Sequence, residues 1–270
     1  MDKVVASAQE AVADIADGAS LAVGGFGLSG IPWTLIAALH DQGAGRLTVV
    51  SNNCGVDGAG LGVLLQDHRI ERVIASYIGE NREFARQFLS GEVEVELTPQ
   101  GTLAQRLHAG GSGVAAFFTP TGVGTAVAEG GLPWRYDGEG RVAVASPPKE
   151  VRSFPMGGTD REYVLEEGIV TDFALVRAAV ADRHGNAVFH AAARNFNPAA
   201  AMAGRVTVLE AERLVEPGEL DADAVHLPGI FVQRVVALTP EQAADKRIEK
   251  RTTSVRPGPS GAAAGEEVGG

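Results

Sequence analysis

The sequence predicts an α/β protein of three layers (α/β/α), with helices on both faces of a mixed, mainly parallel sheet. In the first half of the chain, short apolar runs typical of strands alternate with segments of helical spacing. Glycine occurs 35 times and aromatic residues make up only 6% of the chain, which favours tight strand-to-helix connections over an all-β fold. With 270 residues, 45% of them hydrophobic, the chain is long enough to bury a full core.

Charge and cysteine content exclude several classes of protein. A formal net charge of −11 and a pI near 5.0 disfavour a nucleic-acid binder, because such proteins rely on a basic surface. The single cysteine, Cys54, excludes an internal disulfide and a cysteine-based zinc site, and it fits a reducing compartment. The sequence has no apolar run of about 18 residues and no secretion signal at its start. We therefore expect a cytoplasmic protein that binds neither nucleic acid nor membrane.

Strand and helix signals alternate through the first half of the chain, without an internal repeat. Residues 4–15 have the spacing of an amphipathic helix, and residues 92–98 alternate as a half-buried strand whose glutamates face solvent. The other expected elements of this half are strands at 21–23, 46–50 and 72–77 and helices at 33–39, 61–66, 82–89 and 103–108.

The second half of the chain is richer in strand signals. Residues 114–118 predict a buried strand, and residues 130–151 predict an excursion of turns and short strands outside the core. The remaining expected elements are strands at 173–180 and 187–190 around a hairpin-like turn, a short helix within 191–203, and strands at 205–210 and 232–237. We assign residues 1–238 to one domain and residues 239–270 to a polar tail whose distal part is expected to be disordered.

Residues 17–32, DGASLAVGGFGLSGIP, form the most distinctive stretch: a strand, a glycine loop and the start of a helix. Glycines let a ligand approach backbone N–H groups, and a loop aimed at the positive end of a helix dipole suits an anion or a developing oxyanion. The alternative is a tight turn whose glycines serve chain reversal alone. Gly25, Gly27 and Gly30 also match GxGxxG, but no acidic residue follows the next strand, which disfavours a nicotinamide cofactor.

Neutral amide side chains occur in several loops at expected strand ends. They suit the binding of a carbonyl or thioester group, although each amide could instead make a turn or cap a helix. The residues are Asn52, Asn53, Asn81, Gln100 and Asn195. Cys54 has no histidine beside it in the sequence and is expected to be a packed thiol, while the six scattered histidines show no metal-binding spacing. The residues therefore indicate an acyl or anion site and no metal site.

Residues 17–32 resemble the first signature of the family I coenzyme A (CoA) transferases. That signature begins with Asp or Asn followed by Gly or Asn, and then has three apolar residues, Gly-Gly-Phe and Gly-x-Pro. Every fixed position of that signature is met, and the resemblance covers roughly residues 3–250. It also includes SNNCGVD, SYIGENREF, SGEVEVELTPQGTLAQR, TPTGVGT and ARNFNP. The resemblance implies a CoA-transferase-like fold. Within the family, the loops around Asn52 and Asn81 are most similar to the A subunit of succinyl-CoA:3-ketoacid CoA transferases.

The resemblance implies a ping-pong reaction in which a glutamate attacks the acyl-CoA and then carries CoA as a thioester. That glutamate lies in a Ser-Glu-Asn-Gly motif of the partner B subunit, which this chain lacks, so a hetero-dimer or hetero-tetramer is implied. Glu80 is the alternative nucleophile, but its flanking residues do not match the motif. CoA is then a substrate, with no permanently bound cofactor.

The resemblance also implies roles for particular residues. Asn52, Gln100 and Asn81 would support the oxyanion and acyl pocket, and the glycine loop would bind CoA through Gly24, Gly25, Phe26, Gly27, Leu28, Ser29 and Gly30. One alternative is the A subunit of an acetate-type or 3-oxoadipate-type CoA transferase. Another, in a different class, is a non-catalytic acyl-CoA-binding regulator. A sugar-phosphate isomerase or aminosugar deaminase is disfavoured, because its site would need a general base and phosphate-binding cations.

Overall fold

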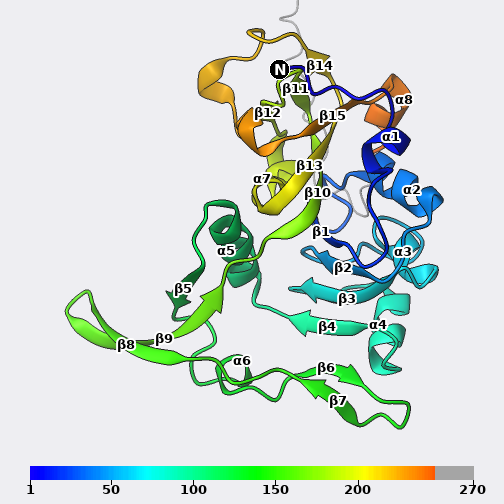
Figure 1. Ribbon diagram of the computed structural model, residues 1–270. Helices are drawn as coiled ribbons and strands as arrows, with labels where there is room; N and C mark the ends of the chain where they lie inside the picture. The colour runs from blue at the N-terminus through cyan, green and yellow to red at the C-terminus, as the bar shows by residue number, and fades with distance from the viewer. Residues whose placement is uncertain (247–270) are drawn as a thin grey trace, which may run out of the picture.

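A seven-stranded sheet forms the centre of the molecule, with the strand order β15-β13-β10-β1-β2-β3-β4 (Figure 1). The computed structural model describes residues 1–246. Every neighbouring pair in this sheet is parallel, so the expected α/β class is confirmed and the antiparallel pairs lie in smaller sheets. The strands are β1 (Ser20–Val23), β2 (Leu47–Val50), β3 (Ile70–Ala75), β4 (Glu94–Leu97), β10 (Thr171–Ala178), β13 (Gly204–Ala211) and β15 (Arg234–Ala237).

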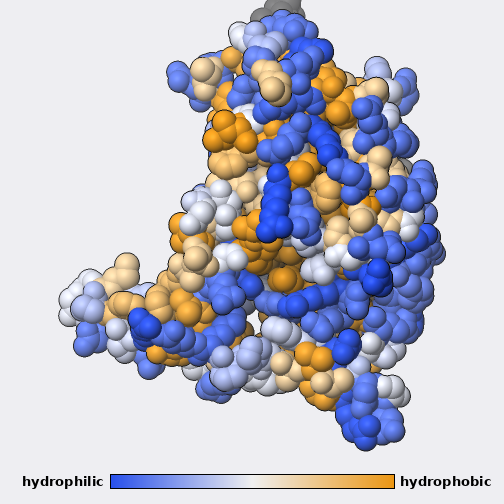
Figure 2. Space-filling model, viewed as in Figure 1, coloured by the Kyte–Doolittle hydropathy of each residue, from blue (hydrophilic) through white to orange (hydrophobic). Residues whose placement is uncertain are grey.

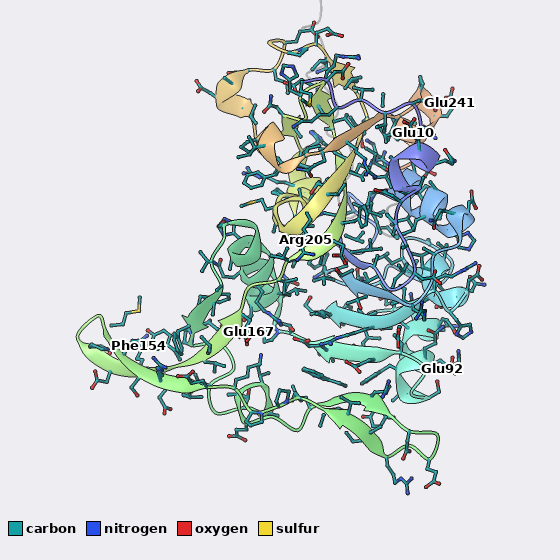
Figure 3. All side chains as sticks on the ribbon, viewed as in Figure 1. Glu10, Glu92, Phe154, Glu167, Arg205 and Glu241 are labelled. Carbon is teal, nitrogen blue, oxygen red and sulfur yellow. The ribbon has the colours of Figure 1, made fainter. Side chains whose placement is uncertain are left out.

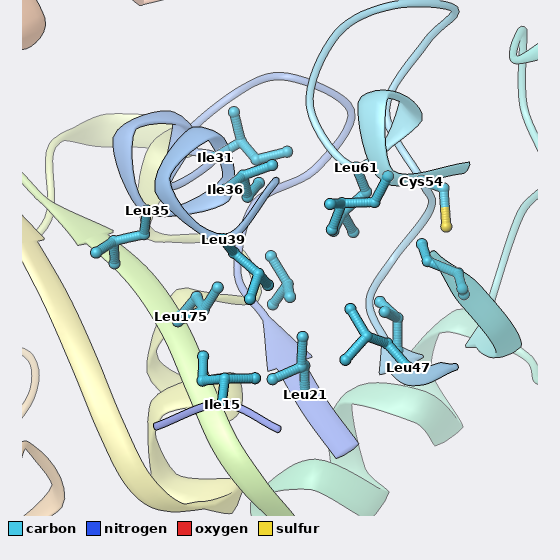
Figure 4. Close-up of a cluster of buried hydrophobic side chains, with 14 of the residues drawn as sticks. Ile15, Leu21, Ile31, Leu35, Ile36, Leu39, Leu47, Cys54, Leu61 and Leu175 are labelled. Atoms are coloured by element: carbon cyan, nitrogen blue, oxygen red, sulfur yellow. The ribbon is translucent and has the colours of Figure 1, made fainter. Parts of the chain in front are cut away.

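Helices cover both faces of the sheet, as the three-layer prediction requires. Successive side chains of a strand point to opposite faces, so Leu21 and Val23 of β1 enter one core and Ala22 enters the other. The first core includes residues of α1 (Ala8–Val12), α2 (Trp33–Gln42), α3 (Gly62–Gln66) and α4 (Arg82–Leu89) (Figure 4). The second includes residues of α5 (Gln100–Gly111) and α7 (Asn197–Ala203).

An antiparallel extension lies between α5 and β10 in the chain. Its β8–β9 hairpin stands away from the body, whereas β6 packs against β4 and α4 (Figures 1 and 2). The extension contains the small sheet β5-β9-β8 and the hairpin of β6 and β7. Its elements are β5 (Ala116–Thr119), α6 (Ala126–Glu129), β6 (Pro133–Tyr136), β7 (Val142–Ala145), β8 (Val151–Met156) and β9 (Thr159–Glu167). Phe154 lies on its outer part, whereas Glu167 lies where β9 reaches the body (Figure 3). The expected excursion is confirmed, but sequence reasoning missed the hairpin of β8 and β9.

A third small sheet, β12-β11-β14, lies beyond the end of β10. Its strands β11 (Val180–Asp182) and β12 (Ala187–Val188) pair antiparallel, which confirms the expected hairpin. Asp182 fixes the turn by accepting hydrogen bonds from the backbone N–H groups of His184 and Asn186. The remaining elements are β14 (Leu214–Val215), η1 (Ala191–Arg194), η2 (Ala222–Ala224), η3 (Gly229–Phe231) and α8 (Pro240–Ala244).

Two expected elements are wrong in extent or surroundings. The helix expected at residues 4–15 is reduced to α1, because Val4 and its neighbours pair with the edge strand β15: Val5 N–H donates to Val235 O, and Val235 N–H donates to Lys3 O. The strand expected at 114–118 is β5, which is not buried, because it belongs to the extension and not to the central sheet. The apolar sequence of residues 114–118 alone therefore did not distinguish an edge strand of a small sheet from a strand of the core.

The solvent-facing glutamates expected on residues 92–98 need a correction at Glu96. Glu96 is 7% exposed and bonds Arg72 at 2.8 Å and Arg106 at 2.6 Å, whereas Leu97 is exposed. Burial opposes ionisation, but the two guanidinium groups outweigh it and hold the pKa of Glu96 below its usual value. Glu96 thus occupies a buried ionic cluster under the extension.

The tail expected from residue 239 begins with an ordered segment. Residues 240–244 form α8, whose carbonyl groups at Gln242 and Ala243 accept hydrogen bonds from the buried Arg177. Residues 247–270, where disorder was expected, lie outside the described part of the chain. The boundary at residue 238 and the disorder beyond it remain predictions.

Candidate functional site

The loops that carry the expected site residues meet at the carboxyl edge of the sheet. Because β1, β2 and β3 are parallel neighbours, the segments after Val23, Val50 and Ala75 emerge side by side. Gln100, the first residue of α5, follows the next strand, β4. The loops that carry the expected residues therefore lie at one edge of the sheet, as the strand-end reasoning predicted.

Asn52 and Gln100, which are far apart in the sequence, come together at this edge. The Nδ2 group of Asn52 donates to Gln100 Oε1 at 3.4 Å and to Ser76 Oγ at 2.8 Å. Ser76 Oγ in turn donates to the backbone carbonyl of Asn52 at 3.1 Å. Asn52 is only 1% exposed, whereas Gln100 is exposed. Asn52 therefore holds Gln100 at the surface, and Ser76 is a member of the cluster that sequence reasoning did not single out.

Two other amides, Asn53 and Asn81, serve the neighbouring loops. Asn53 Oδ1 accepts a hydrogen bond from Gly27 N–H at 3.2 Å and so ties the β2 loop to the glycine loop. Asn81 is buried: its Oδ1 accepts from Phe84 N–H at the start of α4, and its Nδ2 donates to Cys54 O. Asn81 thus makes the helix cap that was the alternative for these amides, and its side chain is turned into the protein instead of into an open pocket.

The glycine loop is a tight turn packed against the rest of the chain. Phe26 and Ser29 exchange two backbone hydrogen bonds of 3.0 Å, which closes the turn. A Cβ on Gly24 would lie 2.0 Å from Asn197 Oδ1, and one on Gly30 would lie 2.8 Å from Ala193 O. Gly24, Gly25 and Leu28 are buried, whereas Phe26 is 47% exposed and Gly27, Ser29 and Gly30 are half-buried. Close packing within the chain therefore explains Gly24 and Gly30 without a ligand.

A second loop repeats the form of the first, which sequence reasoning did not single out. This second loop, residues 55–60 (GVDGAG), follows β2, just as residues 25–30 follow β1. Each loop leads into a helix. Val56 and Ala59 exchange backbone hydrogen bonds, as Phe26 and Ser29 do. The two loops touch, because a Cβ on Gly60 would lie 2.9 Å from Leu28 Cδ2. The sequence signal for this repeat was the shared spacing of the outer glycines.

The positive end of helix α2 is already occupied by a carboxylate of the protein. Glu210 on β13 is fully buried, and its Oε2 accepts a hydrogen bond from Leu35 N–H at 2.9 Å; the Thr34 N–H group also bonds this carboxylate. Pro32, at the N-cap of α2, provides no side-chain cap. The expectation that this helix end would receive a ligand anion was therefore wrong. The neutralising group comes from a distant strand, which local sequence does not reveal.

Glu210 is paired with Arg177 on the adjacent strand β10. Arg177 Nη1 lies 3.2 Å from Glu210 Oε1, and Arg177 Nε donates to Glu212 Oε1 at 3.0 Å. Burial raises the pKa of Glu210 to about 7, against the opposing effects of Arg177 and the two backbone N–H groups. This pair lies beneath the helix that follows the glycine loop, on the same face of the sheet as α2.

The ARNFNP segment holds the end of the glycine loop. Asn195 Nδ2 donates to Ser29 O at 3.0 Å, and Asn197 Nδ2 donates to Gly30 O at 2.9 Å. The buried Asn197 also accepts a hydrogen bond from the backbone N–H of Arg177 at 3.1 Å. Asn195 was expected as a possible ligand donor, but the structure gives it and Asn197 the task of anchoring the loop.

A cavity of about 480 Å³ lies elsewhere, between the sheet and the extension. Its charged lining includes Arg72, Glu96, Arg106 and Lys149, with the Arg72 guanidinium 5.2 Å from the centre of the Trp134 ring. None of the predicted site residues lines it. The carboxyl-edge cluster, not this cavity, is therefore the candidate functional site.

The other candidate groups of the sequence are placed as follows. Cys54 is buried, and burial raises the pKa of its thiol, which confirms the packed role expected for it. Glu80 is exposed on the loop before α4. Within residues 1–246, no group of histidine, cysteine and acidic side chains has the arrangement of a metal site. In the same range, no helix has the length and apolar character to cross a membrane.

Comparison with known proteins identifies the family. A family model described as Coenzyme A transferase matches residues 5–238. The chain is 66% identical over 252 residues to a Mycobacterium tuberculosis H37Rv protein described as the A subunit of a probable succinyl-CoA:3-ketoacid coenzyme A transferase, covering 93% of this chain and 99% of that one. It is 55% identical to the Bacillus subtilis protein with the same description, covering 93% and 95%. The corresponding protein of Helicobacter pylori 26695 is 47% identical, covering 94% and 98%.

Solved structures agree on the fold. An acyl-CoA transferase of Escherichia coli O157:H7 superposes with a TM-score of 0.71 at 25% identity, covering 89% of this chain. The alignment spans 48% of the E. coli chain, so this chain corresponds to about half of that protein. Glutaconate coenzyme A-transferase from Acidaminococcus fermentans superposes with a TM-score of 0.70 at 21% identity, covering 90% and 77%.

Proposed function

The chain belongs to the coenzyme A transferase family, and we propose that it is the A subunit of an enzyme that moves CoA from succinyl-CoA to a 3-oxo acid such as acetoacetate. The observation that carries the proposal is the 47–66% identity, over more than nine-tenths of the chain, to proteins described as the A subunits of such transferases. The carboxyl-edge cluster supports it, because Asn52 and Ser76 form a polar cluster that holds Gln100, a neutral amide suited to donate to a thioester carbonyl.

The proposed reaction is ping-pong. A glutamate supplied by the partner B subunit first attacks the thioester carbonyl of succinyl-CoA, giving an acyl-glutamate anhydride and CoA thiolate. The thiolate attacks the glutamyl carbonyl, which forms an enzyme-CoA thioester and releases succinate. The acceptor carboxylate then attacks that thioester to form a second anhydride and thiolate. Attack of the thiolate on the acceptor acyl group yields the new acyl-CoA and restores the glutamate.

Gln100 is the residue that this chain presents to the reacting carbonyl. Its Oε1 is bonded to the buried Asn52, so its Nε2 group is the donor turned to a ligand oxygen. In the glycine loop, Phe26 has the greatest exposed surface for CoA, while Gly27, Ser29 and Gly30 lie half-buried beside it. Gly24, Gly25, Leu28 and Asn81 act by shaping these loops. The nucleophile comes from the Ser-Glu-Asn-Gly motif of the partner, in a cytoplasmic hetero-dimer or hetero-tetramer.

Reconstitution tests the proposal. The purified chain, a B subunit carrying Ser-Glu-Asn-Gly, and the mixture are each assayed for acetoacetyl-CoA formation from succinyl-CoA and acetoacetate. We expect activity only in the mixture, with CoA trapped covalently on the B subunit. Full activity of the isolated chain, or an inactive mixture of folded subunits, would overturn it.

Variants of the mixture test the assigned roles. Gln100→Ala removes the exposed donor and is expected to lower kcat by about 10²-fold, the usual effect of losing one oxyanion donor. Gln66→Ala is the matched control, because Gln66 is an exposed amide on α3 and does not bond Asn52. Glu80→Gln should retain the CoA adduct on the partner, whereas loss of that adduct would make Glu80 the nucleophile.

A further inference from the structure

Helix α2 begins directly after the glycine loop but has no cap of its own. The loop ends at Pro32, and the first helical residues are Trp33, Thr34 and Leu35. Backbone N–H groups in the first turn of a helix need an acceptor from outside the helix. Here the acceptor is the Glu210 carboxylate, which comes from β13, the strand beside the edge strand β15. The direction in which α2 leaves the loop is therefore tied to one buried side chain.

Arg177 joins this carboxylate to the other anchors of the loop. Its guanidinium pairs with Glu210 at 3.2 Å, and its backbone N–H donates to Asn197, which holds Gly30 O. The same guanidinium donates to two carbonyl groups of α8, at 3.2 and 3.1 Å. Arg177 is 5% exposed and Glu210 is fully buried, so solvent does not compete for these bonds. The entry to α2 and the end of the glycine loop thus share one anchor.

We propose that Glu210 and Arg177 are positioning residues that set the glycine loop against Gln100 and Asn52. The glycine loop contacts the Asn52 segment through the hydrogen bond from Gly27 N–H to Asn53 Oδ1. A shift of α2 at its first turn therefore moves the loop relative to the amide cluster. Well-packed apolar residues often replace a buried ion pair without loss of stability, so we assign this pair a role in fixing geometry.

Trp33 offers a direct readout, because it is the first residue of α2. The chain has two tryptophans, Trp33 and Trp134, so Trp134→Phe leaves Trp33 as the single fluorophore. In that background, Glu210→Ala removes the acceptor and Glu210→Gln keeps an acceptor oxygen. Glu212→Gln is the matched control: it removes a carboxylate from the same arginine and leaves the bonds at α2 in place.

The expected result is that Glu210→Ala at least doubles the quenching of Trp33 by acrylamide, with unchanged far-ultraviolet circular dichroism. Glu210→Gln should restore most of the protection, and Glu212→Gln should match the parent. If Glu210→Ala fails to fold, Glu210→Met takes its place, because it removes the acceptor while filling the space; it should increase quenching, whereas Glu212→Gln should not. Equal quenching in all folded variants would overturn the proposal.

Kinetics of the reconstituted pair provide the second readout, and this part rests on the proposed function. We expect Glu210→Ala to lower kcat by about tenfold, as displaced reacting groups do, with KM changed less than about threefold. Unchanged kcat alongside increased Trp33 quenching would show that α2 moves without consequence and would overturn the positioning role. An inactive parent pair would instead contradict the proposed function, while the fluorescence result would still decide the anchoring of α2.

Discussion

The two glycine loops have the same shape but different anchors. Each closes with a reciprocal pair of backbone hydrogen bonds, Phe26 with Ser29 and Val56 with Ala59. The first is held by residues from distant strands and loops, whereas the second is held from the adjacent loop by Asn81, which bonds Cys54 O, and through Asp57, which accepts from Glu83 N–H. The comparison teaches that the glycine pattern encodes a turn, and that anchoring from distant segments distinguishes the turn that follows β1 from the one that follows β2.

The largest expected effect comes from filling the space beside the first loop. Gly24→Ala would place a Cβ 2.0 Å from Asn197 Oδ1, so Asn197 must move and give up its bonds to Gly30 O and Arg177 N–H. We expect a loss of about 3 to 5 kcal/mol in the free energy of unfolding, measured with urea. Gly101→Ala, in α5 with open space at its Cβ, is the control and should not destabilise. Equal stability of the two variants would contradict the remote anchoring of this loop.

The pH dependence of stability tests the second anchor. The pKa of Glu210 is about 7 in the folded protein, against 4.5 as its ordinary value. Folding therefore favours the protonated form, and the contribution of Glu210 is greatest below about pH 4.5 and falls as pH rises toward 7. Relative to Glu210→Gln, the parent should lose up to about 3 kcal/mol across this interval.

Comparing the parent with Glu210→Gln cancels the effects of the other titratable groups near the pair. These include Glu212, which contacts both Arg177 and Lys246. Unfolding is measured for both proteins at several pH values between 4.5 and 8. A difference that stays constant over this range would show that Glu210 remains charged throughout. Glu212→Gln retains Glu210 and should therefore fall with pH as the parent does, whereas absence of the fall in Glu212→Gln would place the effect outside the contact with α2.

A smaller effect is expected at the tip of the second loop. Gly58 has a φ of +69°, and its Cβ position is open, so Gly58→Ala strains the backbone without a clash. We expect a cost of about 1 to 1.5 kcal/mol in thermal or urea unfolding, and a lower cost for Gly58→Asn, because Asn tolerates this conformation better. A loss as large as that of Gly24→Ala would mean that the second loop is anchored as firmly as the first.

The smallest effect is expected at Asp57, on the surface of the same loop. Its Oδ1 accepts a hydrogen bond from Glu83 N–H at 3.1 Å in the first turn of α4. Asp57→Ala should reduce the free energy of unfolding by about 0.5 kcal/mol, and Asp57→Asn should restore most of it, because an acceptor oxygen remains. Transferase activity of the reconstituted pair should be unchanged in both, whereas a marked loss would assign this loop a direct part in the reaction.

The alternation of apolar runs and glycine loops was enough to predict the parallel α/β body. It located β1, α2, β2, α3 and α4 and the shared edge where Asn52 and Gln100 meet. These features follow from local periodicity and from the rule that parallel strands end at one edge. The family signature at residues 17–32 then identified the class of enzyme.

Only the tertiary structure decided which charges are buried and what they hold. The alternation of residues 92–98 predicts a solvent-facing Glu96, yet the extension covers it beside Arg72 and Arg106. Glu210 reads as one residue of a strand, and nothing near it in the sequence indicates that it caps α2. Both outcomes depend on the order of strands and on segments that return from far along the chain. The sequence alone therefore determined the glycine turn. Packing determined that the first turn of α2, which follows it, is capped by the Glu210 carboxylate, because a capping group need only be near in space.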